Sequence, residues 1–275
     1  MTVRWFGLLG DPVSHSLSPA LYRAAFDYLG AAAHYRAIRV EAGDRPELEA
    51  QLRDLSATGG GNITVPHKEL AAELVDWRSA AVEETGACNC FWLDTEGRLA
   101  GDNTDVAGFL AAADGIDGPR LEGARVLLLG AGGAARAVAV ACASAGAASL
   151  GVCNRSVERA RGLIDDLGLG DLATLHTAES ERAQSWDVVI NATSLGLRSQ
   201  DPLPLTLDVE RHRFAFDLVY GPGGTNWTRH AEGAGIPAID GLTMLISQAV
   251  ESLSRWFGQP TDVDGIARVM RQAVT

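Results

Sequence analysis

The chain has 275 residues, enough for two domains with their own cores, and its 47% hydrophobic and 21% charged residues are typical of a globular protein in water. Its 23 Lys and Arg against 35 Asp and Glu give a formal net charge of −12, which repels nucleic-acid phosphates and favours a small-molecule partner. No membrane-spanning segment is expected, because glycines and an arginine interrupt the longest apolar runs.

The N-terminal residues and the cysteines indicate the cellular compartment. The first apolar run is short and ends before Asp11, which is not typical of a signal peptide, so a cytoplasmic protein is expected. Cys88, Cys90, Cys142 and Cys153 show neither a disulfide framework nor the paired spacing of a zinc site. Cys88 and Cys90 could bind a metal in principle, but no histidine or cysteine stands at a suitable distance. No metal is therefore expected.

Short apolar strands alternate with amphipathic helices from the N-terminus onward, the pattern of a βαβ protein with mostly parallel sheets. Strands are predicted at 4–9, 34–40 and 62–65, and helices at 19–29, 46–56 and 67–75.

The segment VSHSLSP places Ser16 and Ser18 one residue apart, just before Pro19. A serine followed by proline is typical of a helix start, where the serine caps free amides and the proline already has the helical φ. Ser16 lies before that cap, and two hydroxyls that converge on exposed helix amides would form a small anion pocket suited to a carboxylate. The residues alone leave both interpretations open.

Further along, ACNCFWLDTEGRLAGDNTD predicts two strands joined by a turn at Glu96 and Gly97. A helix is predicted from Thr104. The stretch DGIDGPRLEG is rich in Gly, Pro and Asp, which indicates a connection, and a second unit begins after it.

That second unit opens with ARVLLLGAGGAARAVAVACASAG, an apolar strand that runs into glycines and then a small-residue helix. Gly130, Gly132 and Ala135 match the dinucleotide fingerprint, in which glycines let the backbone turn tightly and approach a pyrophosphate at a helix N-terminus. The fingerprint alone is weak. The strand before it, the helix after it and a second strand, ASLGVC, supply the βαβ context that it requires.

The end of the second strand indicates which cofactor binds. Asn154, Arg155 and Ser156 stand where NAD sites usually have an acid to hold the ribose 2′-hydroxyl. An arginine can instead hold a 2′-phosphate through charge-assisted bonds, so NADP is expected. In the alternative interpretation Arg155 is a surface residue that pairs with Glu158.

Seven segments occur in order over essentially the whole chain: SHSLSP, NITVPHK, GDNTD, GAGGAARA, NRS, INATSLG and DGLTMLISQA. In this combination the chain resembles the shikimate dehydrogenase family. The resemblance implies an α/β fold of two domains. An N-terminal α/β substrate domain at 1–104 is rejoined by C-terminal helices at 241–275, and a Rossmann-type NADP-binding domain occupies 105–240.

The resemblance also implies an activity, the NADP-dependent, reversible reduction of 3-dehydroshikimate to shikimate on the way to the aromatic amino acids, with the substrate in the interdomain cleft. The resemblance leaves open whether the protein forms a homodimer. Two alternatives are a relative that also oxidises quinate or accepts NAD, and a catalytically silent NADP-binding regulator. The presence of Lys68 and Asp105 argues against the regulator.

Individual residues take roles from the same resemblance. Lys68 and Asp105 are the implied catalytic residues. Substrate-binding roles fall to two carboxylate-holding serines and to positions near the ring: Ser16, Ser18, Thr64, Asn89, Tyr220 and Gln248. Cofactor-binding roles fall to Gly130, Ala131, Gly132, Gly133, Ala134, Asn154, Arg155, Ser156, Thr193, Leu218 and Gly241.

Lys68 is the residue expected to transfer the proton, because hydride transfer to or from a carbinol carbon requires a general acid/base at its oxygen. It is expected about three residues into a helix that Pro66 begins, where its charge opposes the helix dipole by roughly 0.3–1 kcal/mol. His67 is the competing candidate, since histidines titrate near neutral pH. Neighbouring helical residues point about 100° apart, so both cannot face one oxygen, and the family has an aromatic residue at this position. His67 is therefore expected to pack or to lie on the surface.

Two positions depart from the family pattern. Cys90 replaces a threonine after Asn89, and a thiol is a weaker hydrogen-bond donor than a hydroxyl. Asn226 replaces a proline after Thr225, which changes loop rigidity without removing a chemical group.

Overall fold

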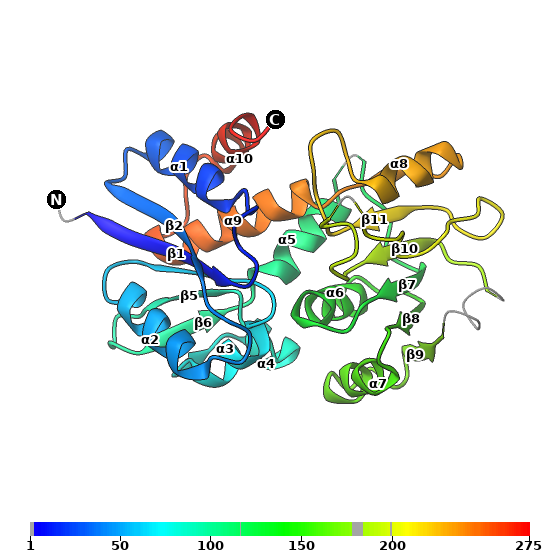
Figure 1. Ribbon diagram of the computed structural model, residues 1–275, viewed down its shortest axis with the longest axis horizontal. Helices are drawn as coiled ribbons and strands as arrows, with labels where there is room; N and C mark the ends of the chain where they lie inside the picture. The colour runs from blue at the N-terminus through cyan, green and yellow to red at the C-terminus, as the bar shows by residue number, and fades with distance from the viewer. Residues whose placement is uncertain (1–2, 116, 178–183, 199) are drawn as a thin grey trace. The chain divides into compact units, whose positions relative to one another are not determined.

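The computed structural model describes residues 3–115, 117–177, 184–198 and 200–275. The chain divides into two compact units, Met1–Gly108 with Ile246–Thr275, and Phe109–Leu245. Within the described residues each unit contains a six-stranded sheet with helices packed on it, which confirms the expected α/β class (Figure 1).

The sheet of the first unit has the strand order β2-β1-β3-β5-β6-β4. Strands β1, β2 and β3 are parallel, whereas β5 and β6 form the antiparallel hairpin that the turn at Glu96 and Gly97 predicts. Gly97 has a φ of 77°, which favours glycine in that turn. The strands are β1 (Arg4–Gly10), β2 (Ala33–Arg39), β3 (Gly60–Ile63), β4 (Trp77–Arg78), β5 (Cys90–Leu93) and β6 (Leu99–Asp102).

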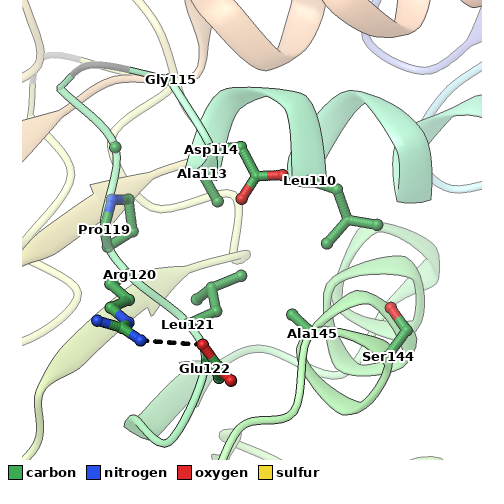
Figure 2. A pocket seen from close by; sticks show the side chains of 11 residues that line it. Leu110, Ala113, Asp114, Gly115, Pro119, Arg120, Leu121, Glu122, Ser144 and Ala145 are labelled. Carbon is green, nitrogen blue, oxygen red and sulfur yellow. Dashed lines mark hydrogen bonds and ion pairs between the residues drawn. The ribbon is translucent and has the colours of Figure 1, made fainter.

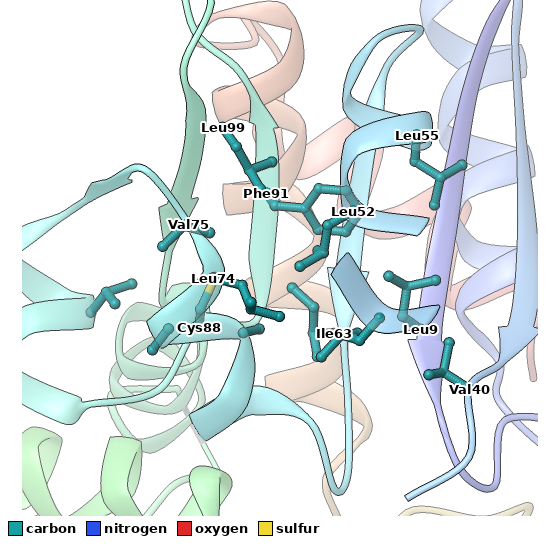
Figure 3. Packing of buried hydrophobic residues seen from close by; sticks show 14 residues of the cluster. Leu9, Val40, Leu52, Leu55, Ile63, Leu74, Val75, Cys88, Phe91 and Leu99 are labelled. Carbon is teal, nitrogen blue, oxygen red and sulfur yellow. The ribbon is translucent and has the colours of Figure 1, made fainter. Parts of the chain in front are cut away.

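Helices cover this sheet, and α1 packs against both β2 and α10 (Figure 1). On α2 the apolar side chains recur at Leu48, Leu52 and Leu55, the spacing of one helix face. That face is buried with Leu9 of β1 and Ile63 of β3 (Figure 3). The helices are α1 (Ser18–Leu29), α2 (Arg45–Ser56), α3 (Lys68–Leu74), α4 (Ala80–Thr85) and α10 (Val263–Gln272), together with α5 (Thr104–Ala113) and α9 (Leu242–Phe257), which each belong partly to both units.

The second unit has a fully parallel sheet in the order β12-β11-β10-β7-β8-β9. The strand order reverses between β7 and β10, which is the switch point of a doubly wound sheet. Its elements are β7 (Arg125–Leu129), α6 (Gly133–Ser144), β8 (Ser149–Cys153), α7 (Val157–Asp166), β9 (Ala173–His176), β10 (Val188–Asn191), β11 (Ala215–Asp217), α8 (Asn226–Gly233) and β12 (Ala238–Ile239).

Two helix starts differ from the prediction. Helix α1 begins at Ser18 itself, with Leu17 as its N-cap, and the Ser18 hydroxyl makes no capping hydrogen bond. The interpretation of Ser18 as a cap is therefore wrong. Helix α3 begins at Lys68, so Lys68 is its first residue and not its third. Pro66 lies before the helix, in a turn closed by the His67 N–H, which donates to the Thr64 carbonyl.

Two short elements, β4 and α4, have no counterpart in the prediction, since two exposed residues and a six-residue helix give too short a pattern. No helix in the described part of the chain is both long and apolar enough to cross a bilayer. In the same residues, His, Cys, Asp and Glu side chains do not gather in groups of three that could hold a metal ion.

Candidate active site

The first unit contains a nearly buried ion pair between Lys68 and Asp105. The Lys68 Nζ donates to Asp105 Oδ2 at 2.5 Å, and the two side chains are only 14% and 7% exposed. A charge-assisted hydrogen bond in such a site is short and strong. Removal of either partner would leave a nearly buried charge, at a cost of about 3–5 kcal/mol.

Asp105 is held from its own helix as well. It is the second residue of α5, where the positive end of the helix dipole favours a carboxylate. Its backbone N–H donates to Asn103 Oδ1 at 3.1 Å, which anchors the start of the helix. The backbone that carries the Asp105 carboxylate is therefore fixed independently of Lys68.

Asn89 orients the other side of the carboxylate. Its Nδ2 donates to Asp105 Oδ1 at 2.8 Å, and its Oδ1 accepts the Thr104 N–H at 2.7 Å. Both oxygens of Asp105 therefore have a donor, one cationic and one neutral. The side-chain amide of Asn89 can be placed only one way round by these partners.

Gln248, on α9, joins this group from far along the chain. Its Oε1 lies 3.4 Å from both Asn89 Nδ2 and Thr104 Oγ1. One turn later Ser252 donates to the Gln248 carbonyl at 3.0 Å and accepts from Asn62 Nδ2 at 2.9 Å. The structure thus brings Lys68, Asn89, Asp105 and Gln248 into one hydrogen-bonded network.

Thr104, Ser252 and Asn62 are members of this network that the sequence reasoning missed. Asn62 and Thr104 lie inside the segments NITVPHK and GDNTD, and Ser252 follows Gln248 by four residues on the same helix. The spacing from Gln248 was the available signal, because residues four apart share a helix face.

The hydroxyl groups of Ser16 and Ser18 are hydrogen-bonded to each other. Their hydroxyl oxygens lie 3.2 Å apart, and the Ser18 N–H donates to Ser16 Oγ at 3.2 Å. Ser16, which lies before the N-cap residue Leu17, is therefore the serine whose hydroxyl accepts from a helix amide. Thr64 is half-buried and directly follows β3, in the turn that leads to α3.

His67 is 1% exposed, and its Nε2 lies 2.8 Å from the Val40 carbonyl. A carbonyl only accepts, so Nε2 carries a proton and donates to it. This ring nitrogen is committed to the interior, which agrees with a packing role and favours Lys68 as the acid/base.

The glycine-rich turn of the second unit lies between β7 and α6. Gly130 has a φ of 118°, and a Cβ there would approach the Ala192 carbonyl to 2.7 Å. Gly132 is the N-cap of α6, and a Cβ on it would meet open space. Among the described residues no side chain caps α6, so its first N–H groups can bind an anion.

The turn after β8 presents an arginine. Ser156 caps α7 by accepting the Arg159 N–H at 3.2 Å, and it donates to Glu158 at 2.9 Å. Arg155 is exposed and has no ion pair within the described part of the chain. The pair with Glu158 is therefore not formed, and the guanidinium can reach a ligand.

Two polar residues that the sequence reasoning missed end the neighbouring strands β10 and β11. Asn191 Nδ2 donates to Asp217 Oδ1 at 2.7 Å, and both residues are fully buried. Burial raises the pKa of the Asp217 carboxyl to about 6, despite hydrogen bonds from Thr225, Asn191 and Val219. The sequence signals were a polar residue at the end of each apolar strand and, for Asn191, its place in the segment INATSLG.

The remaining positions of the predicted cofactor site lie close to these two. Thr193 follows Asn191, and Leu218 follows Asp217. A Cβ on Gly241 would meet the Leu218 carbonyl at 2.2 Å, so only glycine fits there. Tyr220 is half-buried in the same loop.

A hollow of about 580 Å³ opens in the second unit where α5 and α6 end (Figure 2). Its polar lining includes Asp114, Ser144 and an ion pair between Arg120 and Glu122 at 2.9 Å. None of the predicted site residues lines it. It is therefore not a candidate for the reaction site.

Family models match both units of the chain. The model described as shikimate dehydrogenase substrate binding domain matches residues 8–91, and the model described as shikimate / quinate 5-dehydrogenase matches residues 112–210. Between them they cover more than half of the chain.

Curated proteins and solved structures agree with these models. The chain is 41% identical over 271 residues to shikimate dehydrogenase (NADP(+)) of Rubrobacter xylanophilus, covering 96% of this chain and 94% of that protein. The enzyme of the same name from Maricaulis maris is 39% identical over 259 residues, with 92% and 90% covered. Shikimate 5-dehydrogenase of Thermus thermophilus, solved in complex with NADP(H) and shikimate, has a TM-score of 0.82 and 36% identity, covering 99% of this chain and 100% of that one.

Proposed function

The chain belongs to the shikimate dehydrogenase family, and from this premise we propose that it catalyses the NADP-dependent, reversible reduction of 3-dehydroshikimate to shikimate. The observation that carries the proposal is the Lys68–Asp105 ion pair with Asn89 on its second carboxylate oxygen. It supplies a positioned proton donor and acceptor at the place where the family signature predicts one.

The residues of the second unit fit NADP. Gly130 and Gly132 leave room for a pyrophosphate against the first N–H groups of α6, and Arg155 offers an exposed cation for a 2′-phosphate. Bound NADPH supplies the hydride that reduces the substrate carbonyl. Gly130 to Ala134, Asn154 to Ser156, Thr193, Leu218 and Gly241 would hold it.

Lys68 moves the proton. As the carbonyl is reduced, its oxygen gains negative charge and takes a proton from Lys68 Nζ; in the reverse direction the amine accepts the hydroxyl proton. Asp105 holds the ammonium group in place through Oδ2, and Asn89 keeps the carboxylate from rotating through Oδ1. Lys68 and Asp105 are thus assigned catalytic roles, with Asn89 orienting them.

Substrate binding is assigned to the first unit, with one contribution from the second. The Ser16 and Ser18 hydroxyls would donate to the substrate carboxylate. The ring hydroxyls would be bound by Thr64, Asn89 and Gln248. The family resemblance assigns Tyr220 of the second unit to substrate binding as well. We assign 1–104 with 241–275 to substrate binding and 105–240 to NADP binding.

We further propose that the enzyme is cytoplasmic and that it forms a homodimer. The four cysteines Cys88, Cys90, Cys142 and Cys153 are free thiols, which suits a reducing compartment. Sedimentation of the purified protein measures its assembly, and a monomer at assay concentrations would contradict the homodimer.

A direct assay tests the activity against its alternatives. NADPH and NADH formation are followed with shikimate, with quinate and without substrate. Shikimate-dependent formation of NADPH supports the proposal, and comparable rates with quinate or NAD would indicate the relaxed relative. Binding of NADP without turnover of either acid would identify a silent regulator.

A further inference from the structure

The strand order of the parallel sheet indicates where each half of NADP would lie. In a doubly wound sheet a dinucleotide binds outside the carboxyl ends of the strands and crosses the switch point. Here that point lies between β7 and β10, and Arg155 follows β8 on one side of it. The nicotinamide half therefore belongs on the other side, over the ends of β10 and β11.

Asn191 and Asp217 are the last residues of those two strands. They are register partners across the sheet, and Asn191 Nδ2 donates to Asp217 Oδ1 at 2.7 Å. The corresponding positions on β7 and β8 are Leu129 and Cys153, which are register partners in the same row. In this row β10 and β11 therefore end in a hydrogen-bonded polar pair, whereas the adjacent β7 and β8 end in Leu129 and Cys153.

Asn191 holds the segment that follows β10. Its Oδ1 accepts from the Thr193 N–H at 3.1 Å and from the Thr193 hydroxyl at 2.7 Å. Its Nδ2 also donates to the Leu195 carbonyl at 3.1 Å. The path of residues 193–195 therefore depends on one buried side chain.

Asp217 holds the segment that follows β11. Its Oδ1 accepts from the Val219 N–H at 3.1 Å, and its Oδ2 accepts from the Thr225 hydroxyl at 2.6 Å. The Leu218 N–H donates to the Asn191 carbonyl at 2.9 Å, which ties the two segments together. Residues 218 and 219 are therefore held from both strands.

The energetic cost of this arrangement argues against a purely stabilising role. The groups that donate to Asp217 in the described residues are all neutral, and no cation there pairs with it. Burial raises the pKa of this carboxyl to about 6, so the ionised form carries a desolvation penalty. An apolar strand end like that of β7 would avoid this penalty.

We propose that Asp217 and Asn191 are a pair of positioning residues that hold segments 193–195 and 218–219 against the nicotinamide half of NADP. The inference rests on the proposed function and deepens it, because it adds two residues that determine cofactor binding. Neither residue needs to touch the cofactor. Each acts through the backbone and side chains of the segment that it holds.

Asp217→Asn tests the pair with little change in shape. Its amide group accepts on one side only, so either the Thr225 hydroxyl or the pair of donors Asn191 Nδ2 and Val219 N–H loses its acceptor. Calorimetric titration with NADP, without substrate, should show an affinity about tenfold lower than wild type. In the assay kcat should fall by about tenfold, whereas the KM for shikimate should change less than threefold, since Ser16 and Ser18 lie in the other unit.

Trp227→Phe is the matched control. It removes a buried hydrogen bond of the same unit, from Trp227 Nε1 to the Leu205 carbonyl at 2.8 Å, and should lower the melting temperature with little change in NADP affinity. Asn191→Ser is a second test variant and should repeat the kinetic pattern of Asp217→Asn.

The inference is overturned if folded Asp217→Asn and Asn191→Ser bind NADP within twofold of wild type, or if they lose no more affinity than Trp227→Phe. Failure of both variants to fold would also contradict it, because the pair would then serve stability. The titration needs no turnover. A wild-type protein that binds NADP but does not oxidise shikimate would refute the proposed function and leave this inference intact.

Discussion

Two buried aspartates, Asp105 in the first unit and Asp217 in the second, differ in the charge of the groups that donate hydrogen bonds to them. Asp105 has a cation, Lys68 Nζ, at 2.5 Å and a neutral amide on its other oxygen. Within the residues that the structure describes, Asp217 has neutral donors alone, from Asn191, Val219 and Thr225. The Asp105 carboxylate holds the Lys68 ammonium group, for which we propose proton transfer. The Asp217 carboxylate holds backbone segments in place, and its burial raises its pKa to about 6.

The largest effect is expected when the cation is removed from Asp105. Lys68→Ala should lower kcat by about 10²–10⁴, the usual contribution of a general acid/base. The KM for shikimate should rise much less, because Ser16, Ser18 and Gln248 remain. Steady-state kinetics with NADP and shikimate separate the two parameters.

His67→Gln is the control for that variant. Glutamine can still donate to the Val40 carbonyl, so the turn before α3 is kept and kcat should stay within a few-fold of wild type. A large loss of kcat in the histidine variant beside a nearly active lysine variant would reverse the assignment.

The next effect concerns the charge that faces the cofactor. Arg155→Asp removes the partner of the 2′-phosphate and adds repulsion, so NADP binding should weaken by roughly 1.5–3 kcal/mol, while NAD binding hardly changes. Titration with both cofactors measures the difference. Equal affinity of variant and wild type for NADP would show that Arg155 is a surface residue only.

The pH dependence of stability distinguishes the two aspartates. A folded pKa of about 6 for Asp217, above its ordinary 3.8, gives a stabilising contribution that is complete below pH 3.8 and is lost as the pH rises through 6. This contribution amounts to up to roughly 3 kcal/mol.

Urea unfolding of wild type and Asp217→Asn between about pH 4 and about pH 7 measures this contribution. Wild type should lose stability relative to the variant over this range. A difference between the two proteins that does not depend on pH would contradict a raised pKa.

The smallest effects are expected at the two serines. Ser16→Ala and Ser18→Ala should each raise the KM for shikimate, since each loses a hydrogen bond to a charged group worth about 1.5–3 kcal/mol. Only Ser16→Ala should also lower stability, by about 1 kcal/mol, because Ser16 accepts the Ser18 amide. Thermal unfolding beside kinetics tests this, and loss of stability in Ser18→Ala alone would restore the capping interpretation.

The sequence predicts the fold well where the pattern is long. The continuous apolar run before Gly130 predicts a strand, and the leucines of α2 recur with the period of a helix. Both elements lie where they are expected. The predicted start of α3 is wrong because proline often begins a helix, whereas Pro66 here lies in the preceding turn. A single residue type cannot distinguish those two backbones.

Some residues of the candidate site could likewise be predicted from the sequence, and others could not. The short segments around Lys68 and Asp105 predict both members of an ion pair 37 residues apart, but only through their resemblance to a family. Ser252 was signalled only by its spacing from Gln248, and Asp217 is one polar residue in an apolar stretch. Their role depends on partners that only the folded chain brings close.

Rescue of Lys68→Ala by added methylamine tests the central claim most directly, that the Lys68 amine transfers the proton beside Asp105. The variant should regain part of its kcat in proportion to the methylamine concentration, because the added amine can occupy the vacated place next to the carboxylate. Asp105→Asn, which keeps its lysine, should gain nothing. A folded Lys68→Ala protein that binds shikimate and NADP, and either keeps a near wild-type kcat or does not respond to methylamine, would contradict the claim.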